Sequence, residues 1–217
     1  LSKSFYIWHK ENDFKLLGNV SLIVLPGGFA FGDRIYDKAT DTFDISPGTM
    51  ALNSPVNSLI LEAVNRKIPI IGICNGFQIL TKMGLLPGEL VLNECQSFVC
   101  DQVECVFNSP ENNIFSSFQY LCIANSYGKY VNHKELDEDY SYFLRYYETN
   151  EIAGVCNHKL KIFGMMPHPE RNNYDFKHIL LKCVLDDKNT NNFLYFDKCI
   201  NDLMFSEHIS YKTTRKY

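Results

Sequence analysis

A cysteine between two glycines is the residue of this sequence whose type and setting most favour nucleophilic chemistry. In Gly72-Ile73-Cys74-Asn75-Gly76 the thiol follows an apolar run and precedes a helical pattern, with a glycine two residues to either side. This spacing is typical of the sharp strand-to-helix turn that carries the nucleophile of serine hydrolases. A helix N-terminus also stabilises a thiolate. Taken alone, the pattern would equally suit a buried cysteine before a glycine-rich turn.

A histidine and a carboxylate two residues apart form the second candidate. His168 and Glu170 alternate with Pro167 and Pro169 after an apolar run. Both prolines favour an extended backbone, in which residues two apart project to the same side. A carboxylate on one ring nitrogen holds a histidine in the tautomer that can accept a thiol proton. His168 alone would suit an ordinary surface position, but both residues together with Cys74 predict a Cys-His-Glu triad.

A glycine pair supplies the third candidate. Pro26-Gly27-Gly28-Phe29 follows an apolar run. A tetrahedral intermediate needs backbone N–H donors aimed at its oxyanion, and glycine lets the backbone come that close. We expect the loop at Gly27 and Gly28 to supply one donor and the N–H of Asn75 to supply the other. On its own, this segment would be merely a turn.

The elements that must position these residues predict an α/β fold with a mainly parallel sheet. Ser21–Leu25 and Ile68–Ile73 are short apolar runs, typical of buried parallel strands. Asn75–Met83 has a helical pattern that stops at Gly84. The order strand, helix, strand, helix favours this fold class.

A helix is also expected between the two apolar runs. Ser54 is its predicted N-cap and Pro55 its first residue. Five residues give this helix one apolar face, namely Val56, Leu59, Ile60, Ala63 and Val64.

Later segments alternate more between apolar and polar residues. Val91–Phe107 and Phe143–Gly164 suggest antiparallel or mixed strands, and Lys161–Met166 is expected to be the last strand. Asp186–Asn192 is polar and predicts a loop, whereas Phe196–Leu203 predicts a C-terminal helix.

Composition excludes several classes of function. The chain has 217 residues, enough for one well-buried core, with 46% hydrophobic and 21% charged residues. Its formal net charge of −4 gives no sign of a nucleic-acid surface. No apolar run approaches the ~18 residues of a membrane span, and the N-terminus lacks a secretory pattern. We therefore expect a cytoplasmic protein that binds neither nucleic acid nor membrane.

The cysteines do not predict a metal site or a disulfide framework. There are eight of them, with no CxxC pair. Most are expected to be small buried hydrophobes in a reducing compartment. Only Cys74 has a setting that suggests chemistry.

Four motifs together resemble class I glutamine amidotransferases. They are LPGGFAFGDR (Leu25–Arg34), GICNGFQIL (Gly72–Leu80), GLLPG (Gly84–Gly88) and GMMPHPER (Gly164–Arg171). More narrowly, they resemble the glutaminase subunit of phosphoribosylformylglycinamidine synthase, an enzyme of purine biosynthesis. The resemblance covers residues 5 to 171. It implies a flavodoxin-like, mainly parallel sheet with flanking helices, formed by residues 1–217 as one glutamine amidotransferase type 1 domain.

The resemblance also implies the roles of the candidate residues. Cys74 would attack the side-chain amide of glutamine, with His168 as base and then acid and Glu170 orienting the histidine. A glutamyl thioester would form and be hydrolysed. Gln78 and the Gly27-Gly28 loop would help to hold glutamine.

The same resemblance implies a partner. Ammonia would pass through a channel to a larger synthetase subunit, which converts formylglycinamide ribonucleotide to formylglycinamidine ribonucleotide. ATP and magnesium are expected on that partner, because this chain has no GxxxxGK loop and needs no cofactor of its own. Whether a small third subunit bridges the complex stays open.

The chain departs from the family at several places. The strand, loop and helix that normally open the domain do not precede SFYIWHKENDF, so a truncated sheet lacking its first strand and helix is expected. Relatives carry an alanine-histidine-glycine run where this chain has Ala124–Gly128, a change that affects glutamine binding or the ammonia path. Ile35–Pro47 is longer than in many relatives, and Ser97 replaces an arginine.

Two other readings stay open. One is another α/β cysteine hydrolase, of the peptidase and chaperone group with the same cysteine turn. That group does not use a His-x-Glu pair after a late strand, which His168 and Glu170 supply. The other is a non-catalytic interaction subunit, favoured by the altered Ala124–Gly128 segment and opposed by the intact triad residues.

Overall fold

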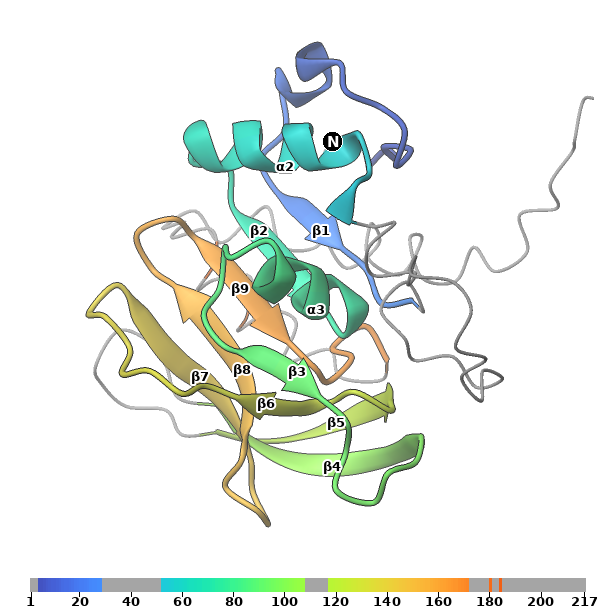
Figure 1. Ribbon diagram of the computed structural model, residues 1–217, viewed down its shortest axis with the longest axis vertical. Coiled ribbons are helices and arrows are strands. Elements are labelled where there is room, and N and C mark those ends of the chain that lie inside the picture. Colours follow the sequence, from blue (N-terminus) through green and yellow to red (C-terminus); the bar gives the residue numbers. More distant parts are fainter. Residues whose placement is uncertain (1–3, 29–51, 108–116, 172–179, 181–183, 185–217) are drawn as a thin grey trace, which may run out of the picture.

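A computed structural model of the chain describes residues 4–28, 52–107, 117–171, 180 and 184. Its main feature is a curled seven-stranded mixed sheet, with a separate two-stranded sheet beside it (Figure 1). The predicted Ile35–Pro47 excursion, the 186–192 loop and the Phe196–Leu203 helix lie outside the described residues.

The order of strands in the large sheet differs from their order along the chain. From one edge to the other the strands are β1 (Ile23–Leu25), β2 (Ile70–Ile73), β9 (Ile162–Met165), β8 (Ile152–Asn157), β7 (Tyr140–Tyr146), β4 (Val99–Phe107) and β5 (Ser117–Asn125). The small sheet pairs β3 (Glu89–Val91) with β6 (Lys129–Val131).

The α/β class is confirmed, but the expectation of a mainly parallel sheet is wrong for the described residues, where the sheet is mixed. Only β1–β2 and β2–β9 pair in parallel, and the other four neighbouring pairs are antiparallel. The reason is the length of the connections. β7, β8 and β9 follow one another through the turns 147–151 and 158–161, too short for the crossover that parallel neighbours need.

The first predicted helix is present as α2 (Val56–Asn65). Leu59, Ile60 and Ala63 are buried as predicted, and the two valines of the predicted face are half-buried. The predicted side-chain cap at Ser54 is wrong.

A distant residue caps this helix instead. The Ser54 hydroxyl donates to the carbonyl of His9 at 2.6 Å, and the same carbonyl accepts from Val56 N–H at 3.0 Å. That carbonyl satisfies a helix N–H that the serine side chain would otherwise have bonded. A short 3₁₀ helix, η1 (Phe14–Leu17), lies next to α2.

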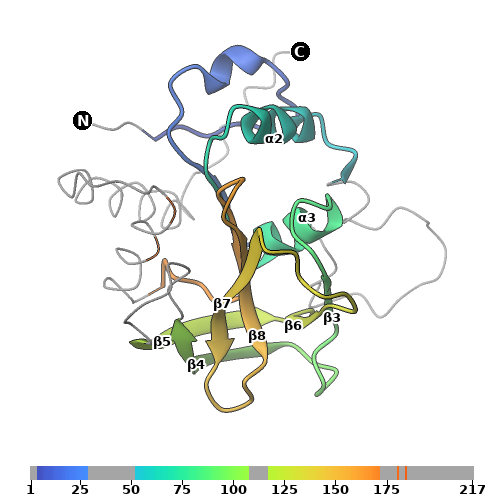
Figure 2. The same cartoon turned by 90° about the vertical axis from the view of Figure 1, so that its left-hand side faces the viewer.

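The second predicted helix is present as α3 (Asn75–Lys82), and the predicted stop at Gly84 is confirmed by its positive φ of 70°. This helix begins directly after β2 ends, and it packs against β2 and β9. Strands β4 and β5 lie at the end of the molecule opposite α2 (Figure 2). None of the helices described is long and apolar enough to cross a bilayer.

Candidate catalytic site

Cys74 lies at a strained turn between β2 and α3. Its backbone has φ 50° and ψ −104°, which a non-glycine residue rarely adopts. The Cys74 N–H donates to the carbonyl of Met165 at 2.7 Å, so the neighbouring strand β9 fixes the turn. The residue is 2% exposed. The sequence prediction of a sharp nucleophile turn therefore agrees with the backbone geometry.

The two glycines flanking this turn are needed for close packing. A Cβ at Gly76 would lie 2.1 Å from the carbonyl oxygen of Leu25 in β1, and a Cβ at Gly72 would lie 2.7 Å from the carbonyl of Gly76. Backbone atoms cannot move away as a flexible side chain can. Any side chain at Gly76 would therefore separate α3 from β1.

His168 and Glu170 form a buried pair just beyond the end of β9. Nδ1 of His168 lies 2.6 Å from Oε1 of Glu170, and the two residues are 3% and 2% exposed. The guanidinium of Arg171 lies 3.7 Å from the same carboxylate oxygen. Within the described ranges, Nε2 of His168 has no hydrogen-bond partner. The ring therefore has one nitrogen held by a carboxylate and one available for proton transfer.

The histidine segment is held by a strand far away in the sequence. The His168 N–H donates to the carbonyl of Cys122 at 2.8 Å, an antiparallel bridge with β5. β5 is the last strand in the order of the sheet, whereas β9 is the third. The curl of the sheet therefore returns β5 to the carboxyl end of β9, where Cys74 lies.

Gly27 shows that the nucleophile and the histidine are neighbours. A Cβ built on Gly27 would lie 2.8 Å from Cε1 of His168 and 3.7 Å from Cβ of Cys74. Both side chains thus reach the same point beside the loop after β1. The structure brings together the three separate sequence candidates: the cysteine turn, the His-x-Glu pair and the glycine pair.

The remaining predicted residues lie around the start of α3. The amide of Asn75 donates to Oε1 of Gln78 at 3.0 Å, and Nε2 of Gln78 donates to the carbonyl of Tyr127 at 2.9 Å. A Cβ on Gly28 would lie 3.6 Å from Oδ1 of Asn75. Gly28, Asn75 and Gln78 therefore lie together at the start of α3, which follows Cys74 directly. Phe29 lies outside the described residues.

Two further features lie near Cys74. The carbonyl of Ala124 lies 3.8 Å from Sγ of Cys74, so the altered segment 124–128 forms a wall of the site. Tyr146, on β7, is the second. Burial raises its pKa, and the thiols of Cys105 and Cys74 add to the rise. One tyrosine among thirteen could not be singled out from sequence alone.

The other described cysteines differ from Cys74 in their setting. Burial raises the pKa of the Cys105 thiol to about 12, which leaves it protonated at neutral pH. Cys95 is exposed, and the hydroxyl of Ser97 hydrogen-bonds its sulfur at 3.2 Å and lowers its pKa. Within the part of the chain described, no three His, Cys, Asp or Glu side chains gather closely enough to hold a metal ion.

Comparison with known proteins places the chain in a family. The family described as the CobB/CobQ-like glutamine amidotransferase domain matches residues 9–148, which is more than half of the chain. A protein from Thermoplasma acidophilum, 15% identical, superposes with a TM-score of 0.56 over 88% of this chain and 82% of its own, and shares the fold. The chain therefore has the fold of a glutamine amidotransferase domain and belongs to this family.

Comparison with individual relatives identifies the family within the glutamine amidotransferases. The phosphoribosylformylglycinamidine synthase subunit PurQ of Prochlorococcus marinus is 37% identical over 180 residues, covering 76% of this chain and 77% of that protein. PurQ of Zymomonas mobilis is 36% identical, covering 78% of each. A chain of the PurLQS structure from Thermotoga maritima is 31% identical with a TM-score of 0.58, covering 84% of this chain and 80% of that one. The chain belongs to the PurQ family of glutamine amidotransferases.

Proposed function

We propose that this chain is the glutaminase subunit of a phosphoribosylformylglycinamidine synthase. It hydrolyses glutamine to glutamate and ammonia in the synthesis of purines. Membership of the PurQ family supports this proposal. The observation that carries the chemistry is the buried His168–Glu170 pair beside the strained turn at Cys74. In the part of the chain that the structure describes, Nε2 of this histidine has no hydrogen-bond partner.

The first half of the reaction makes a thioester. Sγ of Cys74 attacks the side-chain carbonyl carbon of glutamine, and its proton passes to Nε2 of His168. The negative charge that develops on the carbonyl oxygen is stabilised by backbone N–H groups of the Gly27-Gly28 loop and of Asn75. When the carbon–nitrogen bond breaks, His168 returns the proton to the leaving nitrogen. Ammonia and a glutamyl thioester on Cys74 result.

The second half releases glutamate. Water attacks the thioester carbonyl while Nε2 of His168 takes one of its protons, and the same proton then restores the thiol of Cys74. Glu170 stays ionised throughout, because its role is to fix the ring and to stabilise the imidazolium. Gln78 helps to hold the substrate.

The ammonia is delivered through a channel to a larger synthetase subunit. That partner, which binds ATP and magnesium, converts formylglycinamide ribonucleotide to formylglycinamidine ribonucleotide in the cytoplasm. A chain of the Thermotoga maritima PurLQS structure resembles this protein, which supports an assembly with a synthetase. A small bridging subunit is part of the same proposal, and the amidotransferase needs no cofactor of its own.

Labelling of Cys74 tests the proposal. The protein is treated with a diazoketone analogue of glutamine, with and without the synthetase encoded in the same genome, and the modified peptide is found by mass spectrometry. Labelling at Cys74 that increases with the partner is the expected result. No labelling of a folded sample in either condition would overturn the proposal in favour of a non-catalytic subunit.

A further inference from the structure

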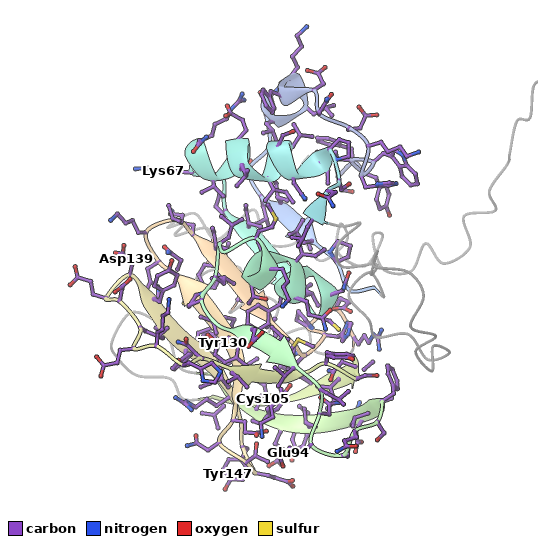
Figure 3. All side chains as sticks on the ribbon, in the orientation of Figure 1. Lys67, Glu94, Cys105, Tyr130, Asp139 and Tyr147 are labelled. Carbon is purple, nitrogen blue, oxygen red and sulfur yellow. The ribbon has the colours of Figure 1, made fainter. Side chains whose placement is uncertain are left out.

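A pocket of about 570 Å³ lies beside strands β4 and β5, separate from the residues proposed to bind glutamine. Its wall includes five carboxylates and one lysine, namely Glu94, Asp101, Glu104, Glu148, Glu151 and Lys129. Figure 3 shows Glu94 at the end of the molecule opposite Lys67, which follows α2. The pocket thus gathers five carboxylates around one cationic side chain.

Some of this charge is already neutralised. Lys129 forms ion pairs with Glu94 and, at 3.3 Å, with Glu151. Glu104 accepts a hydrogen bond from the hydroxyl of Tyr120. Asp101 and Glu148 are exposed and form no ion pair with any described lysine or arginine. The pocket therefore keeps an excess of negative charge that a cationic group would balance.

A second feature of the pocket is an unused hydrogen-bond donor. Asn125 lines the pocket and is only 2% exposed, and its Nδ2 has no hydrogen-bond partner among the described residues. Asn125 lies on the same face of β5 as Ile123, which also lines the pocket. An unsatisfied buried donor is unfavourable, and a carbonyl acceptor from a bound molecule would satisfy it. An amine or guanidinium together with carbonyl groups is the chemistry of a polypeptide segment that carries lysine or arginine.

The same residues touch the catalytic site. Ala124, between Ile123 and Asn125, places its carbonyl 3.8 Å from Sγ of Cys74. Asn93, at the wall of the pocket, donates to the carbonyl of Asn125 at 2.9 Å and accepts from the N–H of Gly128 at 3.0 Å. Segment 124–128 therefore has the pocket on one side and the nucleophile on the other.

Tyr127 extends this link to the start of α3. Its carbonyl accepts from Nε2 of Gln78, and Gln78 in turn accepts from Asn75, the residue after Cys74. A group that enters the pocket and hydrogen-bonds Asn125 would therefore contact segment 124–128, which also positions Gln78 and, through it, Asn75.

We propose that this acidic pocket docks a lysine- or arginine-bearing segment of the synthetase partner, and that segment 124–128 transmits its occupancy to Cys74. The inference rests on the proposed function, since it names where that partner binds and how it activates the glutaminase. The unpaired carboxylates of the pocket favour a segment with a cationic side chain. Nδ2 of Asn125 further favours a segment that places a carbonyl acceptor near that cation.

The test compares two double variants that remove the same two charges. Asp101→Asn with Glu148→Gln removes two negative charges from the pocket, whereas Asp137→Asn with Glu138→Gln removes two from exposed positions outside it. Affinity for the synthetase is measured by calorimetry at low and moderate salt. Labelling of Cys74 by the glutamine analogue is followed as the synthetase is titrated in.

The pocket variant is expected to raise Kd for the synthetase roughly tenfold. It should shift the activation midpoint to higher partner concentration by the same factor and reduce the salt dependence of binding. Without the partner, the pocket variant should be labelled at Cys74 at the same rate as the unmodified chain. The control variant should bind the synthetase with the same Kd as the unmodified chain. Equal affinity of the pocket variant and the unmodified chain would overturn the inference, as would an equal loss in the control.

The outcomes separate this inference from the proposed function. If the unmodified chain binds the synthetase and supports glutamine-dependent synthesis while the pocket variant binds equally well, the pocket assignment alone is wrong. If the unmodified chain is never labelled and never supports synthesis, the proposed function fails first. If the pocket variant loses self-association in sedimentation and keeps its affinity for the synthetase, a second copy is the occupant and the inference is overturned.

Discussion

The imidazole of His168 and the carboxylate of Glu170 lie 2.6 Å apart, from Nδ1 to Oε1, in surroundings that leave both residues almost completely buried. Such a contact fixes the ring, and Nε2 has no hydrogen-bond partner among the described residues. It also makes Glu170 the residue whose replacement most cleanly tests the arrangement, because no part of the substrate needs to touch it.

Glu170→Gln is expected to lower kcat for glutamine hydrolysis by a factor on the order of 10²–10⁴, since an amide can hold the ring in the wrong tautomer. Because the carboxylate does not contact substrate, KM should change little. Kinetics with the partner present, together with circular dichroism and thermal unfolding, check this expectation. Glu135→Gln, at an exposed position outside the site, is the control. An unchanged kcat at saturating glutamine would remove Glu170 from the triad.

Cys74→Ala is expected to abolish synthesis from glutamine and to leave synthesis from free ammonia intact. The thiol is required only to form the thioester, whereas added ammonium salt supplies ammonia directly to the synthetase. Both nitrogen sources are compared in the reconstituted complex. Equal loss with glutamine and with ammonia would show that the variant had disrupted the assembly instead.

Gly27→Ala is expected to reduce glutaminase kcat on the order of a hundredfold, because the added methyl would lie 2.8 Å from Cε1 of His168 and displace the ring. Gly28→Ala is the graded comparison. Its methyl would meet Oδ1 of Asn75 at 3.6 Å, an ordinary contact, and the N–H is retained, so the loss should be much smaller. Equal losses in the two variants would contradict this placement of His168.

Alkylation by iodoacetamide is expected to modify Cys95 well before Cys105 in the native protein. Cys95 is exposed and Ser97 lowers its pKa, whereas burial raises the pKa of Cys105 to about 12. Peptide mass spectrometry over time gives both rates. Ser97→Ala should slow the modification of Cys95 and leave Cys105 unaffected. Faster modification of Cys105 in the folded protein would contradict the burial described above.

The side chain of His158 should make the protein less stable as the pH falls. Burial lowers its pKa, against the opposing charge of Asp139. Below the unfolded value of about 6.5, the unfolded chain therefore binds a proton that the folded chain resists. Stability from the neutral ring is fully present above that pH and is lost as pH falls.

His158→Gln is the variant that isolates this effect. Nε2 of His158 makes a 2.8 Å hydrogen bond with the hydroxyl of Ser141, which a glutamine amide can replace. Urea unfolding is measured at about pH 7.5 and about pH 5.5, on either side of the ordinary imidazole pKa. The variant should lose less unfolding free energy between these two values than the unmodified chain. An identical loss in both would exclude His158 as the source.

The sequence alone was sufficient for the parts of the site that depend on neighbouring residues. A glycine on either side of Cys74, an apolar run before it and a helical pattern after it specify the turn, because all of these act within a few residues. Glu170 is also close to His168 along the chain, but the extended backbone predicted for this segment is wrong. The carboxylate reaches the ring across a turn, in which the Arg171 N–H donates to the His168 carbonyl at 3.2 Å. The class of the fold followed from the order of elements.

Tertiary structure decided what depends on distant strands. Whether two neighbouring strands pair in parallel or antiparallel depends on the connection between them and on the order of strands in the sheet. The amino-acid composition does not determine that order. The first N–H of α2, at Val56, is capped by the backbone carbonyl of His9, which belongs to a segment distant in the sequence. The return of β5 to Cys74 and the acidic pocket beside it arise from the curl of the sheet, since packing brings together residues that are far apart along the chain.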